Sequence, residues 1–216
     1  MRRSSVQTPV GFDRLAPFYD VMMQSIFWGN IRKATAYFLY LIQPYDRILL
    51  LGGGTGWLAS QILQRQPTVQ IDFVEYSPKM MQKAQKRLRN ASQVHFWQED
   101  AFHFQPSQKY NMIITPFFID LFEIPKAQYL VAHLSKYVQA DGWWLLTDFS
   151  ANANFAPLKK RFINFMYSVC RLFCPLEASN YWPYETCFSE EVWEETACRS
   201  FQGGLIQTSA FRIKPL

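Results

Sequence analysis

The sequence has few charged residues, few cysteines and no long apolar run, and each shortage excludes a class of protein. Charged residues make up 18% of the 216 positions, whereas hydrophobic residues make up 49%. A chain of this composition can bury a core, so intrinsic disorder and low-complexity architecture are excluded. No window reaches the roughly 18 to 20 apolar residues that a membrane-spanning helix needs. The first residues carry positive charge without an apolar stretch behind it, so we expect a cytoplasmic protein without a secretory signal.

Cysteines, histidines and basic residues are too sparse or too scattered to form the usual metal or nucleic-acid sites. The four cysteines all lie in the last quarter of the chain and lack the paired spacing of a zinc site. Together with the three ungrouped histidines, this spacing predicts buried free thiols and no metal. The net charge of +5 comes from dispersed residues, which argues against a nucleic-acid partner.

Short apolar runs alternate with segments of helical period from residue 47 onward. This alternation is typical of a Rossmann-like α/β fold, an open and mostly parallel sheet with helices on both faces. Ser77 followed by Pro78 predicts the start of one of these helices. The runs that predict strands are 47–51, 69–74, 94–97, 110–115 and 143–149.

The whole chain, 1–216, is predicted to be a single domain with three parts. Residues 1–46 are expected to form an N-terminal helical cap, 47–150 the ligand-binding core, and 151–216 cover helices and a last strand. Apolar spacing predicts helices near 20–43, 155–174 and 189–201. Since the chain after residue 201 has room for one clear strand, 205–213, we expect a shortened C-terminal strand pair.

A glycine-rich stretch after the first strand predicts a ligand site. Residues 52–56 read Gly-Gly-Gly-Thr-Gly, and glycine allows both a sharp turn and the close approach of a ligand. Ligands of parallel sheets bind at the carboxyl ends of the strands, where Glu75 and Asp100 follow the second and third strands. Taken alone, the glycine stretch could be a tight turn and each acid a solvated carboxylate. Taken together, the glycine stretch and the two acids favour a nucleoside cofactor.

Two phosphate-binding motifs do not fit this turn. Trp57 stands where a dinucleotide fingerprint has its last glycine, and no lysine follows the turn as it does in a P-loop. A bulky residue at this position argues against a pyrophosphate lying across the turn.

Three motifs in this order resemble the class I S-adenosylmethionine-dependent methyltransferases: ILLLGGGTG at 48–56, VEYSPKMM at 74–81 and QEDA at 98–101. The segment FDRLAPFYD at 12–20 is similar to the N-terminal segment of the small-molecule branch that includes the ubiquinone and menaquinone C-methyltransferases. The resemblance implies S-adenosylmethionine as cofactor and S-adenosylhomocysteine as its product.

The resemblance also implies roles for individual residues. One position departs from the family, because Leu50 replaces the acidic residue that usually precedes the first glycine by two positions. The implied cofactor contacts are Gly52, Gly54 and Gly56 at the methionine and ribose, Glu75 at the ribose hydroxyls, Tyr76, Asp100, Ala101 and Phe102 around the adenine, Thr115 beside the sulfonium, and Tyr19 closing the pocket.

The acceptor side is less well marked in the sequence. Methyl transfer from a sulfonium requires positioning, exclusion of water and, for some acceptors, removal of a proton. Phe117 and Asp120, just after the fourth strand, are the expected substrate contacts. Asp120 is the carboxylate that we expect to act as a base or anchor, with a plain loop aspartate as the alternative. No catalytic residue is otherwise indicated.

The predicted function is methyl transfer to a small, apolar or aromatic acceptor, in a pocket lined by the abundant aromatic side chains. A noncatalytic protein that retains the nucleoside pocket is the alternative, and a nicotinamide-dependent oxidoreductase is a third interpretation. The helix at 155–174 has basic residues opposite its apolar stripe. We expect it to cover the pocket, with weak association with a membrane surface as the other interpretation. The oligomeric state is not predicted.

Overall fold

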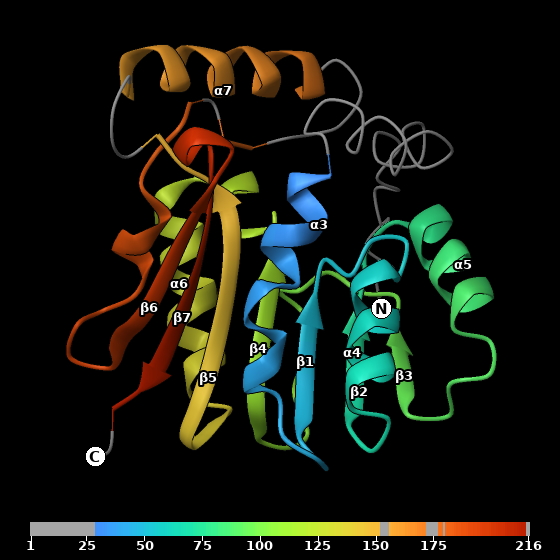
Figure 1. Cartoon of the computed structure of the whole chain (residues 1–216). Helices are drawn as coiled ribbons and strands as arrows, with labels where there is room; N and C mark the ends of the chain where they lie inside the picture. Colours follow the sequence, from blue (N-terminus) through green and yellow to red (C-terminus); the bar gives the residue numbers. More distant parts are fainter. Residues whose placement is uncertain (1–28, 152–155, 172–176, 179, 215–216) are drawn as a thin grey trace, which may run out of the picture.

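The computed structural model describes residues 29–151, 156–171, 177–178 and 180–214. Its centre is a seven-stranded sheet of order β3-β2-β1-β4-β5-β7-β6 (Figure 1). Strands β1 to β5 run parallel, and β7 is antiparallel to both of its neighbours. The strands are β1 Arg47–Leu51, β2 Gln70–Val74, β3 Val94–Trp97, β4 Tyr110–Pro116, β5 Val138–Phe149, β6 Trp193–Phe201 and β7 Ile206–Ile213.

Helices cover both faces of the sheet, as the alternating pattern predicts. Side chains alternate along β1, so Ile48 and Leu50 pack into one hydrophobic cluster and Leu49 and Leu51 into the other. Helix α6 covers one face, while α3, α4 and α5 cover the other (Figure 1). The helices are α3 Asn30–Thr35, α4 Trp57–Arg65, α5 Pro78–Arg87, α6 Ile124–Ser135 and α7 Ala156–Arg171, with short 3-10 turns at Tyr37–Leu41, Ile119–Leu121, Tyr184–Cys187 and Gln202–Gly204.

Helix α5 begins where the sequence predicts. The Ser77 hydroxyl accepts a hydrogen bond of 3.2 Å from the Met80 N–H, and Pro78 occupies the first helical position. Serine at the N-cap satisfies one of the backbone donors that a helix start leaves without a partner. The turn between β2 and α5 is therefore fixed locally, which matters because Glu75 lies in it.

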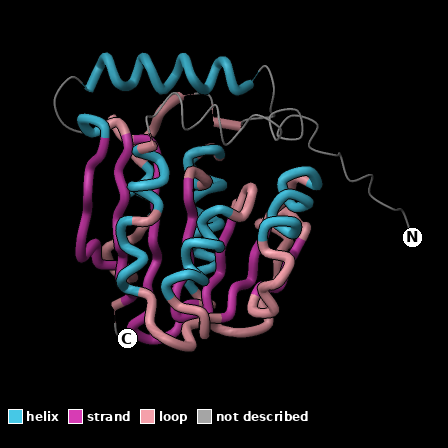
Figure 2. The backbone as a smooth tube through the Cα atoms, turned by 45° about the vertical axis from the view of Figure 1, so that its right-hand side comes forward, coloured by secondary structure: helices cyan, strands magenta, loops and turns pink. Residues whose placement is uncertain are grey.

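Helix α7 lies across the end of the sheet at which β1, β4 and β5 finish (Figures 1 and 2). Its buried side chains Ile163 and Tyr167 form a third hydrophobic cluster with Phe149, the last residue of β5, and Ile206, the first residue of β7. The helix therefore lies over the carboxyl edge of the sheet (Figures 1 and 2). None of the helices in the described part of the chain has the length and apolar character needed to cross a membrane.

The C-terminal region corrects two expectations. The helix expected near 189–201 is wrong, because Trp193–Phe201 forms strand β6 and pairs with β7 along its length. The C-terminal strand pair is therefore complete rather than shortened. As an edge strand, β6 exposes most of its side chains and lacks the clean apolar alternation of a half-buried strand. One free thiol, Cys187, is buried as expected, whereas Cys198 on β6 is exposed.

Candidate functional site

The glycine loop that follows β1 has a backbone that other residues adopt with difficulty. Gly52, Gly54 and Gly56 have φ angles of 63°, 57° and 77°, in the left-handed region. A Cβ atom on Gly52 would lie 2.5 Å from the ring of Phe118, which follows β4. The loop therefore requires glycine at these positions, and it packs against an aromatic side chain from the segment after β4.

The Glu75 carboxylate ties this loop to the start of α5. Its Oε2 accepts a hydrogen bond of 2.9 Å from the Gly54 N–H, and its Oε1 accepts one of 2.8 Å from the Ser77 N–H. These two backbone donors fix the orientation of the carboxylate, and hydrogen bonds to an ionised acceptor are the strong ones. A preoriented acceptor at the end of β2 fits the ribose hydroxyls of a nucleoside.

Helix α5 also holds the loop through Arg87. The Arg87 guanidinium donates hydrogen bonds of 2.9 Å to both the carbonyl oxygen and the hydroxyl of Thr55, a buried residue of the loop. Arg87 was not predicted from the sequence. It lies at the end of α5, 32 positions after Thr55, and no sequence motif indicates that the two residues are in contact.

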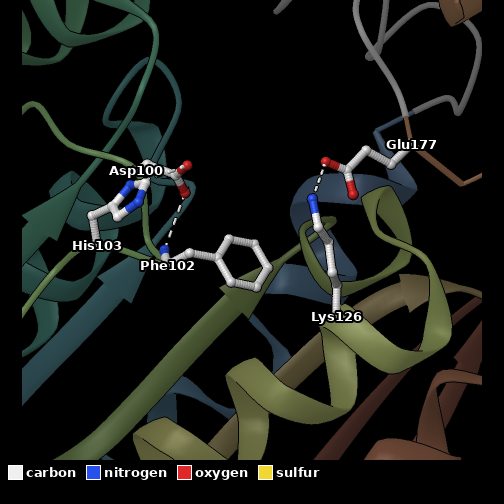
Figure 3. A network of polar contacts seen from close by, with 5 residues as sticks. All are labelled: Asp100, Phe102, His103, Lys126 and Glu177. Atoms are coloured by element: carbon white, nitrogen blue, oxygen red, sulfur yellow. Dashed lines mark hydrogen bonds and ion pairs between the residues drawn. The ribbon is translucent and has the colours of Figure 1, made fainter. Parts of the chain in front are cut away.

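Asp100 forms the turn after β3. Its Oδ1 accepts a hydrogen bond of 3.0 Å from the Phe102 N–H, and the His103 Nδ1 lies 3.6 Å from Oδ2. Figure 3 shows the Phe102 ring pointing from this turn toward Lys126 of α6, whose ammonium lies 5.7 Å from the ring centroid and 2.6 Å from Glu177 Oε1. An exposed carboxylate beside an aromatic ring and a cation suits a planar, polar group such as adenine.

The remaining expected cofactor contacts differ in how accessible their side chains are. Tyr76 is exposed at the end of β2, and Ala101 is buried. Thr115 is fully buried, and its hydroxyl accepts a hydrogen bond of 2.9 Å from the Trp144 indole. Both the side chain and the main chain of Thr115 are therefore shielded in this structure. Leu50 is buried in the core, and Tyr19 lies outside the described residues.

Aromatic rings from two segments, the one after β3 and the one after β4, converge between the glycine loop and the Asp100 turn. The Phe122 ring meets the ring of Phe102 edge-on, with centroids 4.9 Å apart, and that of Phe118 at 5.2 Å. Since Phe118 also packs on Gly52, these rings form one continuous apolar wall. Part of the aromatic excess of the sequence therefore lines the edge at which the cofactor motifs meet.

The chain leaves β4 through a strained residue. Phe117 has a φ angle of 50°, which is unusual for a bulky side chain and typical of functional sites. Its N–H donates a hydrogen bond of 2.6 Å to the Thr147 carbonyl of β5, and its ring packs 4.9 Å from that of Phe149. Phe117 and Phe118 thus contact different neighbours, β5 and the glycine loop.

A buried pair of carboxyl groups lies beneath α7. Asp120, in the 3-10 turn after β4, accepts a hydrogen bond of 2.7 Å from the Tyr167 hydroxyl of α7. Asp148, at the end of β5, is fully buried and interacts directly with Asp120. Within the described part of the chain, Asp120 Oδ1 and both oxygens of Asp148 have no hydrogen-bond partner.

The pKa values of this pair are raised. Burial raises the pKa of Asp120, and the hydrogen bond from Tyr167 partly opposes that shift. Burial and the neighbouring charge of Asp120 raise the pKa of Asp148 well above its usual range. Two neighbouring buried carboxylates repel each other, so the doubly ionised state of the pair is disfavoured. Sequence reasoning found Asp120 but missed Asp148, although a carboxylate in the otherwise apolar strand 143–149 was a signal.

Comparisons with known proteins agree with this geometry. Residues 48–142 match a family described as a methyltransferase domain. Over 104 residues, the chain is 35% identical to malonyl-[acyl-carrier protein] O-methyltransferase 1 of Ilyobacter polytropus, covering 48% of this chain and 38% of that protein. The chain spans about two fifths of the length of the curated relatives it matches.

Solved structures share the fold. N-methyltransferase NodS from Bradyrhizobium japonicum, in complex with S-adenosyl-L-homocysteine, has a TM-score of 0.61 at 13% identity, covering 86% of this chain and 85% of that one. Human N-acetylserotonin methyltransferase, in complex with S-adenosylmethionine, has a TM-score of 0.66 at 16% identity, covering 93% and 56%.

The sheet has the strand order of the class I methyltransferase fold, and the segment matched by the methyltransferase-domain family, 48–142, contains the glycine loop, Glu75 and Asp100. S-adenosyl-L-homocysteine is bound in one of the solved structures that share this fold. Within the class, the curated relatives are named as malonyl-[acyl-carrier protein] O-methyltransferases. The comparisons do not support the narrower likeness to the ubiquinone and menaquinone C-methyltransferases.

Proposed function

We propose that the chain transfers the methyl group of S-adenosylmethionine to a small, apolar or aromatic acceptor beside the ends of β4 and β5. The observation that carries the cofactor half is Glu75, whose carboxylate is fixed by N–H donors of the glycine loop and of the α5 start. Hydrogen bonds to an ionised acceptor are the strong ones. The proposed cofactor contacts are those predicted from the sequence, Gly52, Gly54, Gly56, Glu75, Tyr76, Asp100, Ala101, Phe102, Thr115 and Tyr19.

Bound S-adenosylmethionine supplies an electrophilic methyl group on its sulfonium. The chain has to orient the acceptor, exclude water and hold the proton that the acceptor loses. The rings of Phe102, Phe118 and Phe122 supply an apolar wall for a flat acceptor. Phe117, on the other side of the β4 exit, is the proposed further acceptor contact.

Asp120 and Asp148 are the groups that we propose for the proton. The acceptor O–H or N–H bond breaks as that atom bonds to the methyl carbon. The bond from the methyl carbon to sulfur breaks and leaves S-adenosylhomocysteine, and the proton forms an O–H bond on the carboxyl pair. Burial and mutual repulsion raise the pKa values of both groups, which suits the pair to take up the proton that the acceptor loses. The hydrogen bond from Tyr167 keeps Asp120 oriented.

An acyl group carried by a carrier protein is the second acceptor that we consider, because the curated relatives are named for such a substrate. A hollow of about 360 Å³ lies at the start of α6, next to the Phe102 ring, and is lined by Glu123, Pro125, Lys126 and Glu177. Transfer to a malonyl carrier protein but to no free small molecule would select this acceptor.

Titration calorimetry with S-adenosylhomocysteine tests the cofactor half. We expect Glu75→Gln to weaken binding by about tenfold to a hundredfold, because a charged acceptor is lost and the amide offers a donor to backbone donors. The matched control is Glu194→Gln, an exposed carboxylate on β6, which should leave the affinity unchanged. Equal affinities of the Glu75→Gln variant and the wild type would contradict the assignment.

A panel of methyl acceptors tests the catalytic half. Phenols, aromatic amines and a malonyl carrier protein should be offered with radiolabelled S-adenosylmethionine, and we expect label in at least one class. Tight cofactor binding with no transfer to any acceptor would favour the noncatalytic alternative.

A further inference from the structure

The outer face of α7 carries an apolar stripe that the described part of the chain leaves uncovered. Leu158, Phe162 and Phe165 are 65%, 41% and 65% exposed. Their spacing of four and three residues places them on one side of the helix. Ile163 and Tyr167, on the opposite side, are buried against the sheet. Helix α7 is therefore apolar on both sides, and only the inner side has a partner among the described residues.

Basic residues flank this stripe. The sequence of α7, APLKKRFINFMYSVCR, contains four basic residues and no acidic one. At about 100° per residue, Lys159 and Arg161 project on opposite sides of the line through Leu158 and Phe162. Their long apolar stems can follow the stripe while their charges reach a polar layer. A narrow apolar face with flanking cations is the pattern of helices that lie in a membrane interface.

The position of α7 fits such a role. It lies at the outer limit of the molecule, across the carboxyl ends of the strands, in both views of the backbone (Figures 1 and 2). Other large hydrophobic side chains that are strongly exposed, such as Tyr45 and Tyr129, lie on other elements rather than beside this stripe. The stripe is thus a distinct surface rather than part of a general apolar coat.

We propose that the outer face of α7 docks on an anionic lipid surface. Leu158, Phe162 and Phe165 enter the boundary between headgroups and acyl chains, while Lys159 and Arg161 contact lipid phosphates. The charge of the helix selects anionic over neutral lipid, and the stripe supplies the apolar contact. Docking uses only the outer face, so Tyr167 keeps its hydrogen bond to Asp120. The proposal does not depend on methyl transfer.

Vesicle sedimentation with the full chain tests the proposal. We expect binding to phosphatidylglycerol–phosphatidylcholine vesicles, little binding to phosphatidylcholine alone, and release as the salt concentration rises toward roughly 0.5 M. The double variant Leu158→Ser/Phe165→Ser should lose about tenfold in partitioning, since two exposed apolar side chains no longer enter the lipid. Tyr129→Ser, an equally exposed ring on α6, is the control and should bind like the wild type.

Several outcomes would overturn the proposal. They are no binding to either vesicle, equal binding to neutral and anionic vesicles, and equal binding of the double variant and the wild type. Stripe-dependent binding to an acidic carrier protein without vesicle binding would replace lipid by a protein partner. Unchanged S-adenosylhomocysteine affinity and thermal melting of the double variant would show that it is folded. Failure of this test leaves the proposed methyl transfer unaffected.

Discussion

Replacing Asp148 by asparagine should stabilise the protein increasingly as the pH rises. The Asp148 side chain is fully buried, and burial and the charge of Asp120 raise its pKa well above the ordinary value. In the unfolded chain the same carboxyl group ionises near pH 4. Above that pH the unfolded state binds fewer protons at this site than the folded state, so stability falls as the pH rises toward the folded pKa. Asparagine removes this penalty because it does not ionise.

The expected magnitude follows from the linkage relation. Each pH unit between the unfolded and folded pKa of Asp148 costs the wild type about 1.4 kcal/mol relative to the variant. The difference in the free energy of unfolding between Asp148→Asn and wild type should therefore grow with that slope from about pH 4, and level off above the folded pKa. Removing one acid also removes the repulsion that the other acid experiences. The gain in the free energy of unfolding of the double variant Asp120→Asn/Asp148→Asn should therefore be less than the sum of the gains of the two single variants.

Urea denaturation at a series of pH values measures this difference directly. Asp141→Asn is the matched control, because the Asp141 carboxylate is exposed and makes a surface ion pair of 3.2 Å with Arg212. Its effect on stability should vary little with pH. The reasoning is refuted if the Asp148→Asn difference is independent of pH, or if it shrinks as the pH rises, since either result means that Asp148 is ionised in the folded protein.

Two further substitutions test the loop and the attachment of α7. Gly52→Ala should lower the free energy of unfolding more than Gly203→Ala, because both glycines have positive φ but only the Cβ at Gly52 would meet the Phe118 ring, at 2.5 Å. We expect Gly203→Ala to cost about 1–2 kcal/mol from φ alone. Gly52→Ala should cost more and should also weaken S-adenosylhomocysteine binding. Tyr167→Phe removes the hydrogen-bond donor to Asp120 and should lower the free energy of unfolding by about 1–3 kcal/mol, which thermal melts measure. It should also shift the pH profile of methyl transfer to higher pH, which initial rates measure. An unchanged pH profile would argue against a role for Asp120 in holding the proton.

Local signals predict the parallel half of the fold. The strand 47–51 is apolar on both sides, which only a sheet covered on both faces can accommodate, and its neighbours repeat the pattern. Ser77 and Pro78 mark the start of α5 within the same short segment that carries Glu75. Because each of these features is encoded by adjacent residues, reading the sequence in short windows is sufficient to find them.

The antiparallel half does not give such a signal. Strand β6 lies at the edge of the sheet and pairs only with β7, so most of its side chains face solvent. Its apolar residues are too few to show the period of two, and the spacing that remains resembles that of a helix. The same loss of pattern hides the start of β5, where Tyr137 and Val138 continue the apparent helix although α6 ends at Ser135.

The candidate site also combines residues that a local motif marks with residues that only the fold brings together. The glycine loop and Glu75 were predictable because a motif names them. The proposed acceptor side involves Asp120, Asp148 and Tyr167, which come from three elements. Asp120 and its hydrogen-bond donor Tyr167 are 47 positions apart in the sequence. No spacing rule joins them, and Tyr167 looks like one more ring on an amphipathic helix. What the sequence does show is an acid in a buried strand, and burial of a charge without a partner is costly enough to require a reason. A carboxylate at the end of an apolar strand is therefore the residue to examine first in chains of this kind.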